Sequence, residues 1–180
     1  RRGAIVVGNL GILFYEKRDF SRSRKHLEKA LELAQKIQNR RFEGHVLGNL
    51  GILHFEENRF EDASLHYRQA LQIHRDVGNR RGEGIVLSSL GTLHLAMDRP
   101  EEARAYLELG IKTLRQVGDL VQLGKVLCAR GFLACDESDG GMARTCLVEA
   151  KTIAADLTVT AESELGREIA RLAERLDSGT

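Results

Sequence analysis

Small and hydrophobic residues return along this chain at a fixed interval of forty residues. Residues 47–53 read Leu-Gly-Asn-Leu-Gly-Ile-Leu, and Ala63 and Ala70 follow them. The pattern recurs at residues 7–13, at residues 87–93 and, with more changes, at residues 127–133. A fixed period of this length is typical of proteins whose repeats bury their apolar faces against their neighbours. The pattern therefore predicts a repeat array and not a single closed core.

Within each repeat, apolar residues at helical spacing predict two helices. In the second repeat we expect a first helix over residues 42–57 and a second over residues 60–77, with a turn at Asn58 and Arg59. Gly78 supplies a residue that ends the second helix, and Asn79 can cap the next helix through its side-chain oxygen. Glycine inside a helix costs roughly 1 kcal/mol relative to alanine. Its return at Gly51 and Gly91 therefore predicts a close approach of the two helices, which leaves no room for bulk.

These features predict an all-α solenoid of antiparallel helix pairs with a C-terminal capping helix. We expect a first repeat at residues 1–38, a second at 39–78, a third at 79–118, a degenerate fourth at 119–158 and the cap at 159–180. The first repeat lacks the Gly-Asn-Arg that introduces the later ones, so the chain reads as part of a longer protein. In the fourth repeat Arg130 takes the place of Leu50. We attribute this change to the terminal position of the fourth repeat, which leaves one of its faces without a neighbour. The last helix, about residues 161–176, has an apolar stripe opposite a charged face.

Composition narrows the classes of function. A single proline and 42% apolar residues argue against disorder, and a net charge of +1 provides no field to attract nucleic acid or an anionic membrane. No apolar run approaches the roughly 20 residues of a membrane span, and no signal peptide is evident. The three cysteines suit a reducing compartment and are expected to be small buried residues. We therefore expect a cytoplasmic protein.

The small-Leu-Gly motif of the first helix, followed by two spaced alanines on the second, resembles the tetratricopeptide repeat. Two features depart from that family: the period is forty residues instead of about 34, and Leu47 stands where an early tryptophan is expected. The long period resembles that of Leu-Gly-Asn-repeat spindle-orientation scaffolds and of bacterial signalling proteins with such repeats. The resemblance implies a right-handed superhelix whose inner surface, made by the first helices, grips a peptide or helix of a partner protein.

If the first helix of each repeat lines such a groove, helical spacing selects the residues that face it. The surface would be apolar with a line of small polar groups, suited to a helix or an extended segment. The expected ligand-binding residues are Asn9, Ile12, Tyr15, His45, Asn49, Ile52, Phe55, Ile85, Ser89, Thr92, Leu95, Lys125 and Phe132.

Two of these assignments have alternatives. Asn9 and Asn49 could pair with the main chain of a ligand, or they could cap or bridge neighbouring helices. Arg40-Arg41 and Arg80-Arg81 could grip an anion, but we favour a solvated row of ion pairs with the nearby glutamates, each worth under about 1 kcal/mol. The carboxylate clamp known in the family is not matched, since its basic positions fall on Gly8, Ile85 and Ser89.

No arrangement of residues for catalysis is evident. There is no glycine-rich phosphate loop, no HExxH sequence and no nucleophile elbow. His54 and His94 are one repeat apart, too distant to share a metal ion that needs ligands within about 2 Å. We therefore predict a non-catalytic scaffold without cofactor or metal, with a protein partner and no nucleic acid or membrane. The alternative is a regulatory or self-association module of a larger multidomain signalling protein.

Overall fold

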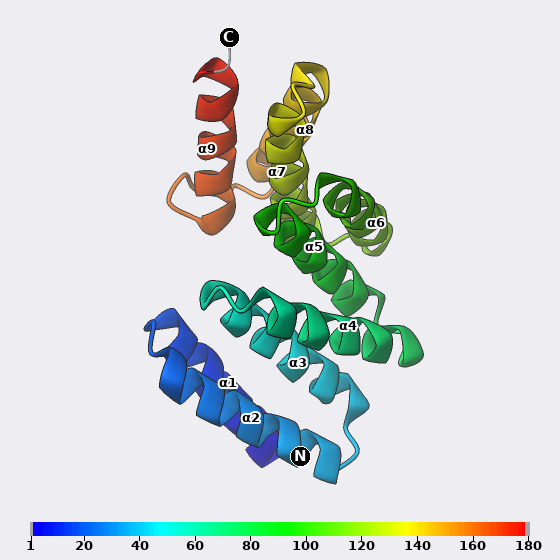
Figure 1. Cartoon of the computed structure of the whole chain (residues 1–180). Helices are drawn as coiled ribbons and strands as arrows, with labels where there is room; N and C mark the ends of the chain where they lie inside the picture. Colours follow the sequence, from blue (N-terminus) through cyan, green and yellow to red (C-terminus); the bar gives the residue numbers. More distant parts are fainter. Residues whose placement is uncertain (1, 179–180) are drawn as a thin grey trace. The chain divides into compact units, whose positions relative to one another are not determined.

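The computed structural model describes residues 2–178, and this range consists of α-helices joined by short connections, without a strand (Figure 1). The all-helical architecture of stacked helix pairs is therefore confirmed. The three helices whose bounds were expected from the sequence differ from those bounds by at most three residues at either end. The helices are α1 (Arg2–Glu16), α2 (Phe20–Lys36), α3 (Arg40–Glu56), α4 (Phe60–Asp76), α5 (Arg80–Ala96), α6 (Pro100–Val117), α7 (Leu120–Asp136), α8 (Gly140–Asp156) and α9 (Glu164–Ser178).

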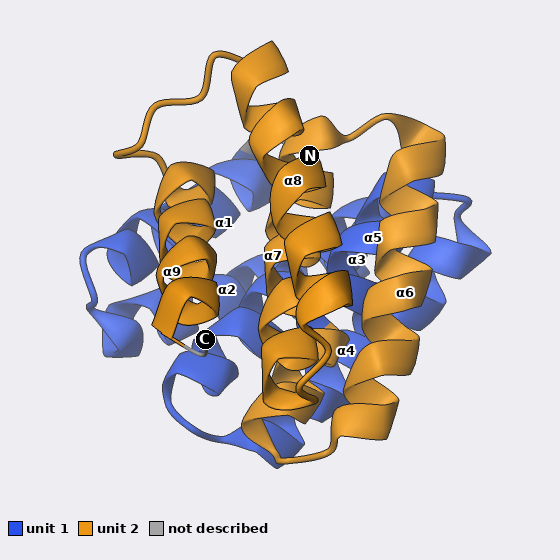
Figure 2. Ribbon diagram, turned by 90° about the horizontal axis from the view of Figure 1, so that it is seen from above, with its two compact units in different colours: residues 1–89 blue, residues 90–180 orange. Residues whose placement is uncertain are grey.

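The helices form two compact units, residues 1–89 and residues 90–180, and α5 contributes to both (Figure 2). In the first unit α1 pairs with α2 and α3 with α4, while α2 also packs on α3. In the second unit α7 pairs with α8, and α6 packs on α7. Helix α9 packs against both α7 and α8, as a cap.

Tight turns separated by twenty residues connect the helices. The second residue of each turn has a positive φ, although only two of these residues are glycines: Arg18, Gln38, Asn58, Gly78, Asp98, Gly118, Ser138 and Thr158. The expected role of Gly78 is thus confirmed, with φ at 65°. The other turns place side chains in a left-handed conformation that is uncommon outside glycine. The sequence therefore indicated a left-handed residue at Gly78 but not at the turns that lack glycine.

At five of these turns the residue after the left-handed position caps the following helix. Side-chain oxygens of Asp19, Asn39, Asn79, Asp119 and Asp139 accept the backbone N–H three residues further on. Asn79 therefore has the capping role expected of it, at 3.2 Å from the Gly82 nitrogen. Arg59 and Arg99 stand at the same place and cap nothing through their side chains.

Close packing of the helix pairs depends on the recurring glycine of the first helix. A Cβ atom on Gly51 would lie 2.5 Å from the Tyr67 ring, and one on Gly91 would lie 2.6 Å from the Leu107 side chain and 3.2 Å from its backbone nitrogen. The close approach inferred from the sequence is confirmed. The atoms that forbid bulk belong chiefly to a large residue of the second helix and not to its alanines.

Helix α9 has the amphipathic character expected of a cap. Leu165, Ile169 and Leu172 are buried, whereas Arg167 and Arg171 are exposed. The helix begins at Glu164, a few residues later than the pattern suggested, because residues 157–163 form an irregular connection. The apolar stripe therefore closes the second unit on α7 and α8.

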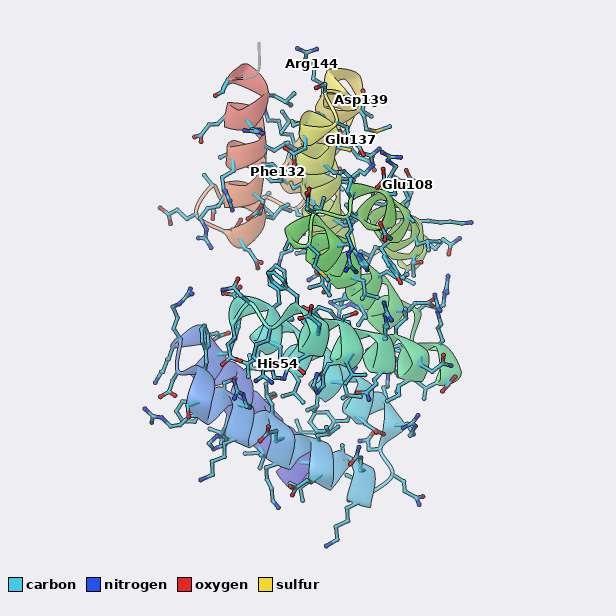
Figure 3. The ribbon with its side chains drawn as sticks, viewed as in Figure 1. His54, Glu108, Phe132, Glu137, Asp139 and Arg144 are labelled. Atoms are coloured by element: carbon cyan, nitrogen blue, oxygen red, sulfur yellow. The ribbon has the colours of Figure 1, made fainter. Side chains whose placement is uncertain are left out.

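Arg130 corrects one inference from the sequence. Its side chain does not lie on a face without a neighbour: the residue is 6% exposed, with Nη1 3.6 Å from Glu137 and Nε 3.9 Å from Glu108. Glu108 and Glu137 can be located in Figure 3. Nη1 of Arg130 has no hydrogen-bond partner, and Arg104 also pairs with Glu137. The leucine position of the repeat is thus occupied by a buried guanidinium whose carboxylate partners lie 3.6 Å and 3.9 Å away.

Restoring the leucine should stabilise the protein. A buried ion pair replaced by a well-packed apolar residue is often neutral or stabilising by about 1–4 kcal/mol, and Glu137 keeps Arg104 as its partner. We therefore expect Arg130→Leu to raise the midpoint of urea unfolding. Arg130→Ala, which leaves a cavity, should lower it. A lower midpoint for Arg130→Leu would show that the guanidinium contributes more than its geometry indicates.

Candidate protein-binding surface

In the first unit, helices α1 and α3 present a face of isoleucine and asparagine residues. Ile5 is 44% exposed and Ile12 is 38% exposed, and Asn9 lies between them on α1. On α3, His45 is exposed and Asn49 and Ile52 are half-buried. Since α1 and α3 contact each other, the structure brings these two sets of residues onto neighbouring helices.

The two asparagine amides have no internal hydrogen bonds. Within residues 2–178, neither the Asn9 nor the Asn49 side chain bonds to a cap, a turn or a neighbouring helix. The alternative that they bridge helices therefore finds no contact to support it. An unpaired amide beside apolar side chains can both donate to and accept from the backbone of a ligand.

Aromatic residues near the ends of α1 and α3 each contact a phenylalanine at the start of the following helix. The ring of Tyr15 lies 6.0 Å from that of Phe20, and the ring of Phe55 lies 5.9 Å from that of Phe60. Tyr15 and Phe55 are half-buried. Both rings are therefore partly covered by the protein and do not extend freely from the surface.

Helix α5 carries four of the expected residues, divided between the two units. Ile85 and Ser89 belong to the first unit, and both are half-buried. The Ser89 hydroxyl donates to the Ile85 carbonyl oxygen at 3.1 Å. Thr92 is exposed and Leu95 is half-buried in the second unit. Ser89 thus already uses its donor inside α5.

The two expected residues on α7 contact the capping helix. The Lys125 ammonium pairs with Glu164 of α9, and the Arg171 guanidinium lies 5.9 Å from the centre of the Phe132 ring. Phe132 is labelled in Figure 3. Both α7 residues are half-buried. The apolar stripe in the sequence of α9 predicted that this helix packs on the array. Nothing in the sequence indicated that charged residues of α9 would contact Lys125 and Phe132.

Arg40 at the start of α3 and Arg80 at the start of α5 pair with nearby glutamates, but these glutamates are buried and not solvated as expected. Arg40 Nη1 lies 2.8 Å from Glu43, and Arg75 Nε lies 3.0 Å from Glu83, which also pairs with Arg80. Glu43 and Glu83 are each 6% exposed. Their carboxylates are thus occupied by the protein's own cations.

A buried histidine shares the cap of α5. Asn79 Oδ1 accepts the Gly82 N–H, so its amide nitrogen must donate to His74 Nδ1, 3.1 Å away. His74 is 2% exposed. Burial, followed by the charges of His45 and Arg41, lowers the pKa of His74 from 6.5 to about 4. The imidazole is therefore neutral at pH 7, and its Nδ1 acts as an acceptor.

His45 links this cluster to the exposed face. Its ring lies 5.1 Å from that of His74. Desolvation, followed by the charges of Arg41 and Arg81, lowers the pKa of His45 below its usual value. At neutral pH His45 therefore offers a ligand an uncharged ring.

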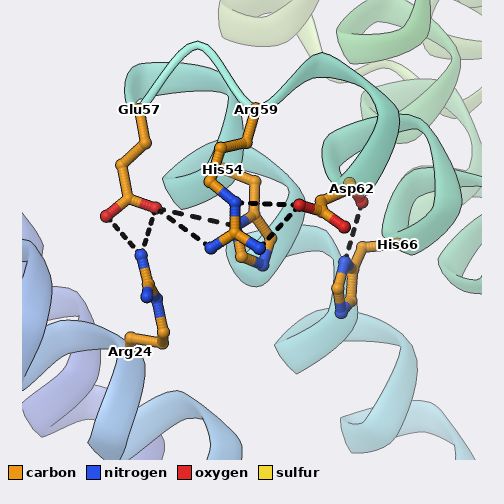
Figure 4. A network of polar contacts seen from close by, with 6 residues as sticks. All are labelled: Arg24, His54, Glu57, Arg59, Asp62 and His66. Carbon is orange, nitrogen blue, oxygen red and sulfur yellow. Dashed lines mark hydrogen bonds and ion pairs between the residues drawn. The ribbon is translucent and has the colours of Figure 1, made fainter.

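A concavity that the sequence did not predict is lined by residues of α2, α3 and α4. It has a volume of about 580 Å³, and its floor includes Leu50 and His54. Arg24 of α2 reaches across to both carboxylate oxygens of Glu57, while Arg59 pairs with Asp62 at 2.6 Å (Figure 4). Burial and the neighbouring His66 and Arg59 lower the pKa of His54. Most charges here are therefore paired within the protein.

The cysteines lie in the second unit as free thiols. Cys128 and Cys146 are buried and Cys135 is half-buried. Burial raises the pKa of the Cys128 thiol to about 12, which keeps it protonated and unreactive at neutral pH. Among the described residues, no group of three or more histidine, cysteine or acidic side chains is placed to hold a metal ion. In the same range, every helix is too short or too polar to cross a membrane.

Comparison with known proteins agrees with this architecture. A family model described as tetratricopeptide repeat matches residues 4–76. The chain is similar to the crystal structure of BtubC from P. vanneervenii, with a TM-score of 0.77 and 17% identity, over 97% of this chain and 75% of that one. It is also similar to the apo form of RapI, with a TM-score of 0.79 and 12% identity, over 97% of this chain and 67% of that one. The comparison with curated proteins gave no match.

The stacked pairs of helices, each joined by a tight turn, define an α-helical repeat protein. Residues 4–76 match the tetratricopeptide repeat model, and the fold of helix pairs over the rest of the described chain is similar to that of the two solved structures. Repeats of this family are typically non-catalytic, and they support a general role in protein interaction.

Proposed function

We propose that the chain is a non-catalytic scaffold that binds a helix or extended segment of a partner protein on the first helices of its repeats. The observation that supports this most is the pair of unbonded amides, Asn9 and Asn49, beside the exposed Ile5 and Ile12. A peptide segment needs both apolar contact and partners for its backbone groups, and this face provides both.

The electrostatics of the face favour a neutral or weakly charged segment. Arg40 and Arg80 are paired with buried glutamates, and the lowered pKa of His45 leaves its ring uncharged at pH 7. Apolar burial would therefore provide most of the affinity, and the amides would set the register of the ligand.

Loss of both amides should weaken binding without unfolding the protein. We would select peptides from a displayed random library on the 180-residue protein and map their contacts by NMR. For a peptide that contacts α1 and α3, Asn9→Ala with Asn49→Ala should weaken binding about tenfold or more, since each lost hydrogen bond is worth about 1 kcal/mol. The melting temperature should stay nearly constant, because neither amide has a hydrogen-bond partner in the described part of the chain.

Gln69→Ala is the matched control, since this exposed amide lies on α4, away from the proposed face. It should leave peptide affinity unchanged. The proposal fails if selected peptides contact only the second helices of the repeats. It also fails if the asparagine double variant unfolds while its folded fraction binds normally, since the amides would then be structural.

A further inference from the structure

Helix α1 has a second exposed apolar face, distinct from the one that carries Ile5 and Ile12. Val6 is 57% exposed, Leu10 is 37% exposed and Leu13 is 43% exposed. Their spacing of four and three residues places them along one side of the helix. A continuous apolar stripe of this kind on a soluble protein usually marks a contact surface.

The corresponding stripe of α3 is completely covered. One repeat further along the chain, Val46 is 1% exposed, Leu50 is 2% exposed and Leu53 is 0% exposed. These residues form one buried cluster with Leu27 and Ala30 of α2. The face that is open on α1 is therefore, on α3, the contact with the second helix of the preceding repeat.

The second unit provides an independent example of this contact. Val126 and Leu133 of α7 occupy the same repeat positions and are 2% and 1% exposed. Helix α6, the second helix of the preceding repeat, packs on α7. In both units the second helix of the preceding repeat thus covers this stripe. The stripe of α1 is the exception.

Charged residues at the edge of this helix contact indicate which charge a partner helix on α1 should carry. Arg24 of α2 pairs with Glu57 after α3, and Arg104 of α6 pairs with Glu137 after α7. The position of these glutamates after α1 is occupied by Lys17, which is exposed. The sign of the charge is reversed there, so a complementary helix would carry an acid where α2 carries Arg24.

We propose that the stripe of Val6, Leu10 and Leu13 is a docking surface for the second helix of one further repeat of this kind, with an acidic residue opposite Lys17. That helix would bring a leucine and an alanine at the positions of Leu27 and Ala30. The proposal is independent of the ligand face described above, because it uses another side of α1.

A peptide derived from the chain itself tests the proposal. The probe is the sequence of residues 19–38 with the substitution Arg24→Glu, titrated into the isotope-labelled 180-residue protein. We expect saturable NMR shifts centred on Val6, Leu10 and Leu13. We also expect a gain of helical circular dichroism, because a free peptide of this length is only marginally helical. The unsubstituted peptide should bind more weakly, since its arginine would face Lys17.

Variants of the protein separate this surface from others. Leu10→Asp and, as a milder change, Leu13→Gln should weaken peptide binding about tenfold or more, with circular dichroism confirming that both variants remain folded. Leu65→Asp is the control, since Leu65 is an apolar residue of α4 that is 54% exposed. It should leave peptide affinity unchanged.

Three results would overturn the proposal. One is the absence of any shift on α1 at saturating peptide. Another is shifts centred on α3, which would mean that the peptide displaces α2. The third is a dimer in light scattering that Leu10→Asp converts to a monomer, because a second copy of the chain would then cover the stripe.

Discussion

Replacing Gly51 with alanine should destabilise the protein, against the usual preference of helices for alanine. The new Cβ would lie 2.5 Å from two ring carbons of Tyr67, whose side chain is only 3% exposed and has little space to move. Overpacking of this kind typically costs about 1–3 kcal/mol. Gly51→Leu adds more atoms to the same space and should cost more. Urea unfolding followed by circular dichroism measures both changes.

Gly48 is the matched control, because it lies in the same helix one turn earlier. A Cβ there would meet only Val86 Cγ2, at 3.9 Å, which is ordinary contact. Gly48→Ala should therefore stabilise the protein by up to about 1 kcal/mol through helix propensity. If both alanine variants moved the unfolding midpoint in the same direction, close packing at Gly51 would not explain the recurring glycine.

Acidification should destabilise the protein through His74. Its pKa is about 4 in the folded state and near 6.5 when unfolded. Between these values the unfolded chain binds more protons, so the free energy of unfolding falls as the pH decreases from 6.5 to 4. Each pKa unit corresponds to about 1.4 kcal/mol, so the expected loss is roughly 3 kcal/mol. Above pH 6.5 the contribution is complete.

A His74→Gln variant isolates this effect from the titration of carboxylates. The difference between the unfolding free energies of the two proteins should change across pH 4 to 6.5 and stay constant above pH 7. NMR of the His74 ring should give a midpoint near pH 4 in the folded protein. A midpoint near 6.5 would show that Asn79 and the surrounding burial do not hold the ring neutral.

The helix pairs could be derived from the sequence because their signals are local and repeated. The period that carries Gly11, Gly51 and Gly91 fixed the pairing of helices, and Gly78 with Asn79 marked one complete turn. The turns at Arg18 and Gln38 were less evident, because a left-handed conformation at those residues is imposed by the helices on both sides. The repeat period thus indicated these turns, although Arg18 and Gln38 have a low propensity for the left-handed conformation.

The candidate surface was predictable only in part. Helical spacing placed Asn9 and Asn49 on one side of their helices, but hydrogen bonding decides whether an amide is available. Within residues 2–178 both amides are unbonded, whereas Ser89 is engaged and Lys125 and Phe132 contact α9. Those contacts join residues that are far apart in the chain, so no spacing rule indicates them.

The sequence by itself determined that this chain forms repeated helix pairs, because hydrophobic period and capping residues act within a few turns of helix. Only the tertiary structure decided which equivalent positions differ in burial and charge. Arg130 is buried where a free face was expected, while Val6 and Leu10 are open although their counterparts on α3 are covered. The reason is physical: burial depends on which helix packs alongside, and this information lies outside the repeat that carries the residue.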